Sequence, residues 1–244
     1  MQLTNGTQVP AYSWMPDARV AYSELKAEVS CEGGISGGQC NDPQYNADSR
    51  IWVSRPTGEK VRTLYQENSN IIDFAQSPDG KKLAYVAFEG IPSDVRKVWK
   101  LSVYDSESGS AKVIASNRSN EGYFFVRWAP SGEAIMYMTL DQTNPAAPSG
   151  RLNLVKPDGT ELGRMALAAN STSTGALTFG PAISDDGSKV IFAVNQDLHE
   201  AGIDGPGIYS MQLAHPIPEF PLTALLVALP VAAVVAVMRI RLVR

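Results

Sequence analysis

The feature that most limits the fold of this chain is a short turn sequence set between apolar runs. Ser77-Pro78-Asp79-Gly80 separates two runs of partly alternating apolar residues. Proline fixes φ, aspartate hydrogen-bonds to the nearby backbone, and glycine takes the positive φ that closes the bend. The pattern therefore predicts an antiparallel strand–turn–strand unit over residues 71–88.

The same turn occurs at three other places along the chain. These are Met15-Pro16-Asp17-Ala18, which is one residue shorter, Ala129-Pro130-Ser131-Gly132 and Ser184-Asp185-Asp186-Gly187. In the three copies that end in glycine, an aliphatic and then an aromatic residue follow the glycine at the same spacing, as Leu83 and Tyr85 follow Gly80. A repeat at intervals of roughly 50 residues indicates an array of supersecondary units. The residues that we single out as turn formers are Asp17, Pro78, Asp79, Gly80, Pro130, Gly132, Asp186 and Gly187.

Each unit also contains a second expected hairpin, at residues 51–65, 98–115 and 151–167. Four short strands per unit, with no convincing amphipathic helix, predict an all-β fold of the β-propeller type with about four four-stranded blades. The alternative is an irregular β-sandwich whose hairpins happen to be alike. The expected propeller covers residues 1–214, with blade repeats near 7–65, 71–115, 122–167 and 178–214.

These turns resemble the WD-like repeat of TolB-type propellers and of the N-terminal propellers of the prolyl oligopeptidase family. Leu3-Thr4-Asn5-Gly6, ahead of the first turn, is similar to the end of one such blade. The resemblance covers roughly residues 1–213 and implies a fold rather than a function. Such rings usually have more than four blades. Either the chain is the C-terminal part of a larger ring, or Met1–Thr4 supplies the last outer strand of a four-bladed one.

Residues 24–50 form an expected insertion in the first unit, and they hold the only two cysteines, Cys31 and Cys40. Two cysteines in a glycine-rich loop predict a disulfide in an oxidising compartment. Two free thiols or half of a metal site are the alternatives, although no histidine or further cysteine lies nearby. Ser36 lies in a G-x-S-x-G stretch, but no strand precedes it and no helix can follow it, so we expect a flexible loop and not a nucleophile.

Other polar features favour surface loops over a chemical site. Residues 195–207 gather Asp197, His199, Glu200 and Asp204, whose spacing matches no standard metal pattern. Asn5, Asn117 and Asn170 match the glycan acceptor pattern. We expect no catalytic residue, cofactor or metal, and the aromatic residues of the second and third units are expected in the core. The cysteine loop and residues 195–207 are the candidate contact surfaces.

The net charge is −4, with 25 acidic and 21 basic residues, and no basic stripe is present. Nucleic-acid binding depends on neutralising phosphates, so this charge distribution argues against it.

The C-terminal segment has the pattern of a membrane anchor. Residues 220–238 carry no charge and are followed by Arg239, Arg241 and Arg244. A helix of this length covers about 28 Å, close to the roughly 30 Å of a bilayer core. We expect a linker over residues 215–221, a transmembrane helix over 222–240 and a cytoplasmic tail over 241–244, with the propeller extracellular. A buried core helix is the alternative.

Pro218-Glu219-Phe220, ahead of the apolar segment, is similar to the PEF-type C-terminal sorting signals of archaeal surface proteins. The resemblance implies that an archaeosortase removes the span, whereas simple single-span anchoring needs no enzyme and is the default expectation. Together these features predict a non-catalytic, membrane-anchored binding or scaffold module with a protein or glycan partner. The alternatives are an accessory propeller of a surface hydrolase, either a peptidase or a lyase, whose catalytic part lies elsewhere, or a TolB-like component of an envelope complex.

Overall fold

The computed structural model describes residues 10–15, 17–31, 35–36, 39–40, 43–90, 97–118, 121–141, 149–168, 181–184, 188–194, 207–212 and 241–242. All regular structure in these residues is strand, and no helix occurs among them. The chain divides into two compact units, residues 1–126 and 127–244, and each is considered by itself.

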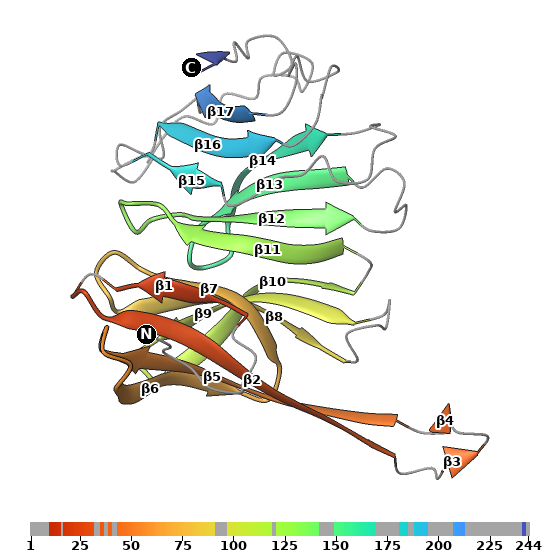
Figure 1. The fold of residues 1–244 in the computed structure, drawn as a ribbon. Coiled ribbons are helices and arrows are strands. Elements are labelled where there is room, and N and C mark those ends of the chain that lie inside the picture. The colour runs from red at the N-terminus through yellow and green to blue at the C-terminus, as the bar shows by residue number, and fades with distance from the viewer. Residues whose placement is uncertain are drawn as a thin grey trace. The chain divides into compact units, whose positions relative to one another are not determined.

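The first unit holds two four-stranded sheets, which follow the order of the chain (Figure 1). The first sheet consists of β1 (Tyr12–Trp14), β2 (Val20–Cys31), β5 (Pro43–Ser54) and β6 (Lys60–Glu67), with β3 (Ile35–Ser36) and β4 (Gln39–Cys40) as a separate pair. The second sheet consists of β7 (Asn70–Gln76), β8 (Lys82–Glu89), β9 (Val98–Asp105) and β10 (Ser110–Arg118). Each expected strand–turn–strand unit is therefore half of a sheet.

Two more four-stranded sheets follow in the rest of the chain. The third consists of β11 (Glu121–Trp128), β12 (Ile135–Asp141), β13 (Ser149–Val155) and β14 (Glu161–Ala168). The fourth consists of β15 (Ala182–Ile183), β16 (Lys189–Val194), β17 (Gly207–Gln212) and β18 (Arg241–Leu242). Four sheets in which consecutive strands pair have the topology of propeller blades, so the all-β prediction with four-stranded sheets is confirmed.

The repeated turns share one hydrogen-bond pattern, which explains why the sheets are alike. In the second sheet the Ser77 N–H donates to the Lys82 carbonyl and the Gly80 N–H donates to the Ser77 carbonyl, both at 2.9 Å. Corresponding bonds run from Ala129 to Ala134, from Gly132 to Ala129 and from Ser184 to Lys189. In the first turn Met15 bonds to Arg19 instead, so this turn is one residue shorter, as its sequence predicts.

The core of the first unit lies between its two sheets. The repeat positions Tyr22, Leu83 and Tyr85 are each at most 2% exposed. The buried cluster that includes Leu83 and Tyr85 consists of Ala11, Met15, Ala21, Ile51, Val53, Leu64, Ile71, Phe74, Leu83, Tyr85 and Ala87. In the second unit Ile135, Met136, Met138 and Leu152 are buried within the third sheet. Of the nine aromatic residues expected in the core, Tyr85, Phe88, Trp99, Tyr123, Trp128 and Tyr137 are buried, and Tyr104, Phe124 and Phe125 are half-buried.

A carboxylate joins β7 to β11 in the first unit. Asp73 lies at an irregularity in the β7–β8 register, and its Oδ2 accepts a hydrogen bond from the Val126 N–H at 2.9 Å. Its Oδ1 accepts from the Phe74 N–H, also at 2.9 Å. Both residues belong to the first unit, so this bond ties the end of that unit's chain to β7.

The C-terminal segment falls mostly outside the described residues. Both the expected linker at 215–221 and the expected span at 222–240 lie there, as does Met1–Thr4. Within the described ranges, no helix has the length and apolar character needed to cross a membrane. Arg241 and Leu242 pair with Ser210 and Tyr209 of β17, whereas the sequence places them beyond a membrane span. Among the described strands, β18 is the one that pairs with the edge of β17 opposite β16.

Candidate functional site

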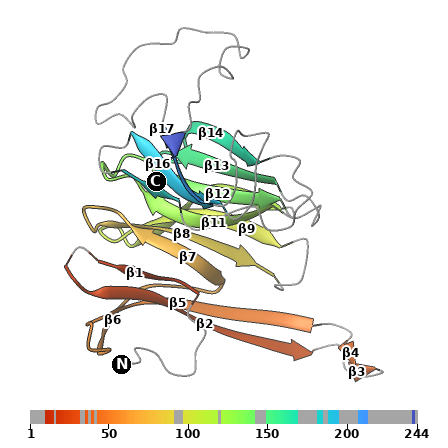
Figure 2. The same ribbon diagram turned by 45° about the horizontal axis from the view of Figure 1, so that its top comes forward.

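A two-stranded arm extends from the first sheet. β2 and β5 have 12 residues each, and their register runs without a break from Val20 opposite Ser54 to Cys31 opposite Pro43. β1 pairs only with residues 20–22 of β2, and β6 pairs only with residues 49–54 of β5. We call residues 26–31 and 43–48 the arm (Figures 1 and 2). Six residues at about 3.3 Å each give it a reach of about 20 Å.

The arm gives the expected insertion over residues 24–50 a form that the sequence did not predict. Most of that segment is strand, because β2 and β5 continue into it. Lys26, Glu28 and Asn46 belong to residue types that are depleted in strands, so their sequence gave a weak strand signal. The period-2 alternation of Tyr22, Glu24, Lys26 and Glu28 was the signal that could have revealed the extension.

The tip of the arm carries the cysteines. β3 and β4 pair there, with Ile35 opposite Cys40. Cys31 is disulfide-bonded. Its pairing with Cys40 stays a prediction, because the side chain of Cys40 lies outside those that the structure describes. Only the backbone of Ser36 is described, so the expectation that Ser36 is not a nucleophile also stays a prediction.

The base of the arm is fixed to the sheet by a partly buried ion pair. The Lys60 ammonium group on β6 donates to both carboxylate oxygens of Glu24 on β2, at 2.8 and 2.9 Å. Glu24 is only 8% exposed. The same ammonium lies 4.4 Å from the centre of the Trp52 ring on β5. Because three strands contribute to this contact, it stabilises the point at which the arm leaves the sheet.

β5 is also joined to the second sheet at this level. The buried Ser49 hydroxyl donates to the Ser69 carbonyl at 2.6 Å and accepts from the Ile71 N–H at 3.0 Å. One residue farther out, Asp48 accepts from Arg50 and from Gln66, each at 3.0 Å. These bonds give the arm a defined direction relative to the two sheets of the first unit.

The arm itself is polar and open to solvent. Lys26, Ala27, Glu28, Ser30 and Asn46 are all exposed. Among the described strands none pairs with the outer edge of either arm strand. A two-stranded ribbon with open edges and charged side chains can bind by adding a strand, and this is the chemistry that the arrangement offers.

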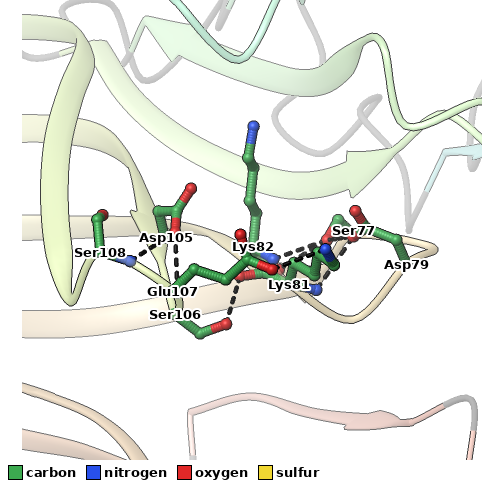
Figure 3. Close-up of polar contacts among 8 residues, drawn as sticks. All are labelled: Ser77, Asp79, Lys81, Lys82, Asp105, Ser106, Glu107 and Ser108. Carbon is green, nitrogen blue, oxygen red and sulfur yellow. Dashed lines mark hydrogen bonds and ion pairs between the residues drawn. The ribbon is translucent and has the colours of Figure 1, made fainter.

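A second polar cluster lies where the β7–β8 and β9–β10 turns meet (Figure 3). Lys81 Nζ is 2.7 Å from Glu107 Oε1, and the Ser106 hydroxyl donates to the Lys81 carbonyl at 2.7 Å. The Ser77 hydroxyl lowers the pKa of Asp79, and the backbone N–H groups of Ser108 and Glu107 lower that of Asp105. These side chains satisfy one another and the turn backbones, so the cluster has a structural role.

The other predicted residues are placed as follows. Asp17 binds the Arg19 guanidinium, with Nε 2.7 Å from Oδ2, and this hydrogen bond lowers the pKa of Asp17. Gly132 takes a positive φ in its turn, which follows Pro130. The Asn117 amide donates to Glu121 Oε2 at 3.1 Å. Outside the described residues lie Asn5, Asn170, Asp186, Gly187, Pro218, Glu219, Phe220 and residues 195–206. Within the described ranges, no three potential ligands gather in a metal-binding arrangement.

Three tyrosines, of which Tyr85 is buried and Tyr65 and Tyr104 are half-buried, form a contact between the first two sheets that the sequence did not predict. The hydroxyls of Tyr65 and Tyr85 are 2.8 Å apart, and Tyr65 also donates to Glu67 Oε2 at 3.1 Å. The rings of Tyr65 and Tyr104 lie 4.7 Å apart. Burial raises the pKa of Tyr65 to about 12 and raises that of Tyr85 as well. The two hydroxyls bond to each other and the rings pack in the core of the first unit, which is the arrangement of a packing contact.

No protein family matches the sequence, and no curated protein is significantly similar to it. Among solved structures, an oligogalacturonate lyase in complex with manganese is 15% identical, with a TM-score of 0.46 over 81% of this chain and 52% of the other. Kuenenia stuttgartiensis hydrazine synthase is 16% identical, with a TM-score of 0.49 and coverages of 84% and 64%. A putative dipeptidyl aminopeptidase IV from Bacteroides ovatus is 11% identical, with a TM-score of 0.49 and coverages of 82% and 29%. The chain thus spans less than two thirds of each, and similarity at this level assigns it neither a family nor an activity.

Proposed function

We propose that this chain is a binding module, anchored at the outer face of a membrane, whose contact element is the arm. The observation that carries the proposal is the extension of β2 and β5 beyond their sheet. An isolated two-stranded ribbon gains little stability from its own contacts. The exposed residues of the arm add little to the core, so its length is better explained by contact with another molecule.

The base of the arm supports this proposal. Glu24, Lys60 and Ser49 fix the strand residues next to the arm by hydrogen bonds of 2.6–3.0 Å. A contact element that is fixed before binding loses less conformational entropy when it binds. The arm is therefore presented in one direction rather than as a free loop.

The proposal includes two finer points that come from the sequence. The repeat is of the TolB-like type, which the shared turn bonds at Ser77 and Ala129 support. The anchor is the uncharged segment at 220–238, followed by Arg239, Arg241 and Arg244, with Pro218-Glu219-Phe220 as its sorting motif.

Photo-crosslinking of the full chain in its native membranes tests the role of the arm. A benzophenone amino acid replaces Ser30 on the arm or, as a matched control, Val113, which is 47% exposed on β10. We expect a discrete adduct from position 30 and none from position 113. A chain in which residues 26–48 are replaced by Asn-Gly, a two-residue hairpin turn, should lose its partner while keeping the circular dichroism of the sheets. Equal labelling at both positions, or none at position 30, would contradict the proposal.

A further inference from the structure

The outer edge of β2 has a backbone pattern that restricts what can pair with it. β1 covers this edge at residues 20–22, and the Ser23 N–H donates to the Ala11 carbonyl at 2.9 Å. From Glu24 onward, none of the described strands pairs with this edge. An edge whose N–H and C=O groups are open is a template for another strand.

The bond from Ser23 shows which backbone groups point outward. Ser23 faces β1, and successive residues of a strand direct their backbone groups to alternate sides. The β2–β5 register has no irregularity. The backbone groups of Leu25, Ala27 and residue 29 therefore face the open edge, whereas those of Glu24, Lys26 and Glu28 face β5.

Two copies of this edge can pair antiparallel only in certain registers. Outward-facing residues must lie opposite outward-facing residues, so a symmetric pairing is centred on one residue and not between two. In a register centred on Lys26, the Lys26 residues of the two copies lie opposite each other, and Glu24 of each copy lies opposite Glu28 of the other. In a register centred on Glu28, the two Glu28 residues lie opposite each other. Like charges that lie directly opposite destabilise a pair of strands.

The register centred on Ala27 is different. It places Lys26 opposite Glu28 twice, once on each side of the centre, and Glu24 opposite Ser30. These are positions without direct backbone bonds, where opposing side chains come closest. Lys26, Ala27 and Glu28 are all exposed and share no covering element among the described residues. A register centred on Leu25 also opposes Glu24 and Lys26, but it brings the second strand into the place of β1.

We propose that the partner of the arm is a second copy of this chain, paired along residues 24–30 of β2 and centred on Ala27. This rests on the proposed function, in which the arm is the contact element. Charges on an open edge usually keep strands apart. Here positions 24, 26 and 28 are acidic, basic and acidic. This order makes the edge complementary in charge to the same edge of an identical chain. Anchoring both copies in one membrane would raise their effective concentration and favour this short contact.

Charge reversal in the full, detergent-solubilised chain tests the pairing. Lys26→Glu and Glu28→Lys each create two pairs of like charges, so each should weaken the dimer by about tenfold or more. The double variant Lys26→Glu/Glu28→Lys restores opposite charges and should recover most of the lost affinity. Arg62→Glu, an equal change of charge at an exposed position on β6, is the control. Sedimentation equilibrium over a concentration series gives the dissociation constants.

A cysteine at the symmetry centre tests the register. Directly opposed residues with mutual backbone bonds have Cα atoms about 5.5 Å apart, which a disulfide can span. Ala27→Cys should therefore give a dimer linked through position 27, identified by mass spectrometry, and Val113→Cys should not.

The outcomes separate this pairing from the proposed function. A monomeric chain whose arm is crosslinked to a different protein would overturn self-pairing and leave the arm as a contact element. A dimer that survives both single charge reversals would overturn the register. An arm that crosslinks to nothing, in a monomeric chain, would overturn both proposals.

Discussion

Ala18 and Gly80 occupy the same place in two copies of the repeated turn. Ala18 has φ of 62°, and Gly80 and Gly132 have φ of 73° and 75°. The backbone of the turn is thus conserved between copies although one copy lacks glycine. A left-handed conformation costs an ordinary residue about 1–2 kcal/mol, whereas glycine adopts it freely. The sequence predicted the turn at Ala18 from its neighbours Pro16 and Asp17, but not that alanine would accept this strain.

Exchanging the two residues should have opposite effects on stability. Ala18→Gly should stabilise the fold by up to about 1 kcal/mol, because relief of strain exceeds the entropy that glycine adds to the unfolded chain. Gly80→Ala should destabilise it by about 1 kcal/mol. The nearest atom to an added Cβ there is Gln76 Nε2 at 3.5 Å, an ordinary contact, so the cost comes from the backbone.

Urea unfolding, followed by tryptophan fluorescence, measures both changes. Ala111→Gly, at an exposed position in β10, is the matched control and should destabilise the fold by about 0.5–1 kcal/mol. A loss of stability in Ala18→Gly as large as that in Ala111→Gly would show that the turn is not strained.

The pair of hydroxyls at Tyr65 and Tyr85 should make stability depend on alkaline pH. Burial raises the folded-state pKa of Tyr65 to about 12, above its ordinary value of 10.0. The stabilisation from its neutral form is therefore complete below pH 10 and is lost as the pH rises toward 12. In an absorbance titration of the phenolates, Tyr65 and Tyr85 should ionise later than an ordinary tyrosine, and the thermal midpoint should begin to fall above pH 10.

Tyr65→Phe should remove the contribution of Tyr65 to this late ionisation. It should also cost about 1–2 kcal/mol, because the buried Tyr85 hydroxyl loses its hydrogen bond to Tyr65. Tyr104→Phe is the control, since it keeps a ring 4.7 Å from that of Tyr65 and leaves the hydroxyl pair in place. An unchanged titration in Tyr65→Phe would assign the late ionisation to another tyrosine.

At the scale of elements, β2 and β5 show what a single sequence can and cannot reveal. The bases of both strands were predicted, because Val20, Tyr22 and Trp52 repeat the apolar alternation of the other sheets. The arm was not, because its pairing of Lys26 with Asp48 and Glu28 with Asn46 depends on a register between distant segments. Residues with poor strand propensity form strands here because the register begun in the sheet continues outward.

Removing the ion pair at the base should loosen the arm more than removing an exposed pair. Lys60→Met takes two hydrogen bonds from the buried Glu24 carboxylate, which should cost about 1–3 kcal/mol. Arg55→Met breaks the Arg55–Glu59 pair, whose side chains are 62% and 61% exposed, and should cost less than about 0.5 kcal/mol. Thermal unfolding gives the stability difference. Hydrogen exchange should accelerate at residues 24–26 and 48–50 in Lys60→Met alone. Equal exchange in both variants would show that the Glu24–Lys60 ion pair does not hold the base of the arm.

At the scale of the whole molecule, the repeat was enough to predict the sheets. Each repeated turn specifies one hairpin, and each following glycine turn adds the second, so four strands per unit follow from local chemistry alone. The hydrogen bond from the Val126 N–H to the Asp73 carboxylate was not predicted, because a side-chain bond between residues far apart in the sequence leaves no periodic pattern. The sequence placed a candidate contact surface at the cysteine-bearing segment, which stays a prediction, and it did not reveal that β2 and β5 extend into this segment.

The C-terminal segment presents two arrangements that exclude each other. Arg241 and Leu242 pair with β17, yet a helix over residues 222–240 that crossed a membrane would carry them to the side opposite the sheet. If the proposed anchor holds, the pairing of β18 is dispensable. A chain that ends after Pro221 should then leave the membrane on carbonate extraction, whereas the full chain and one that ends after Ile240 should both stay. If the full chain is instead extracted, and if loss of residues 241–244 lowers the thermal midpoint by several degrees, then β18 completes the fourth sheet and the anchor must be abandoned.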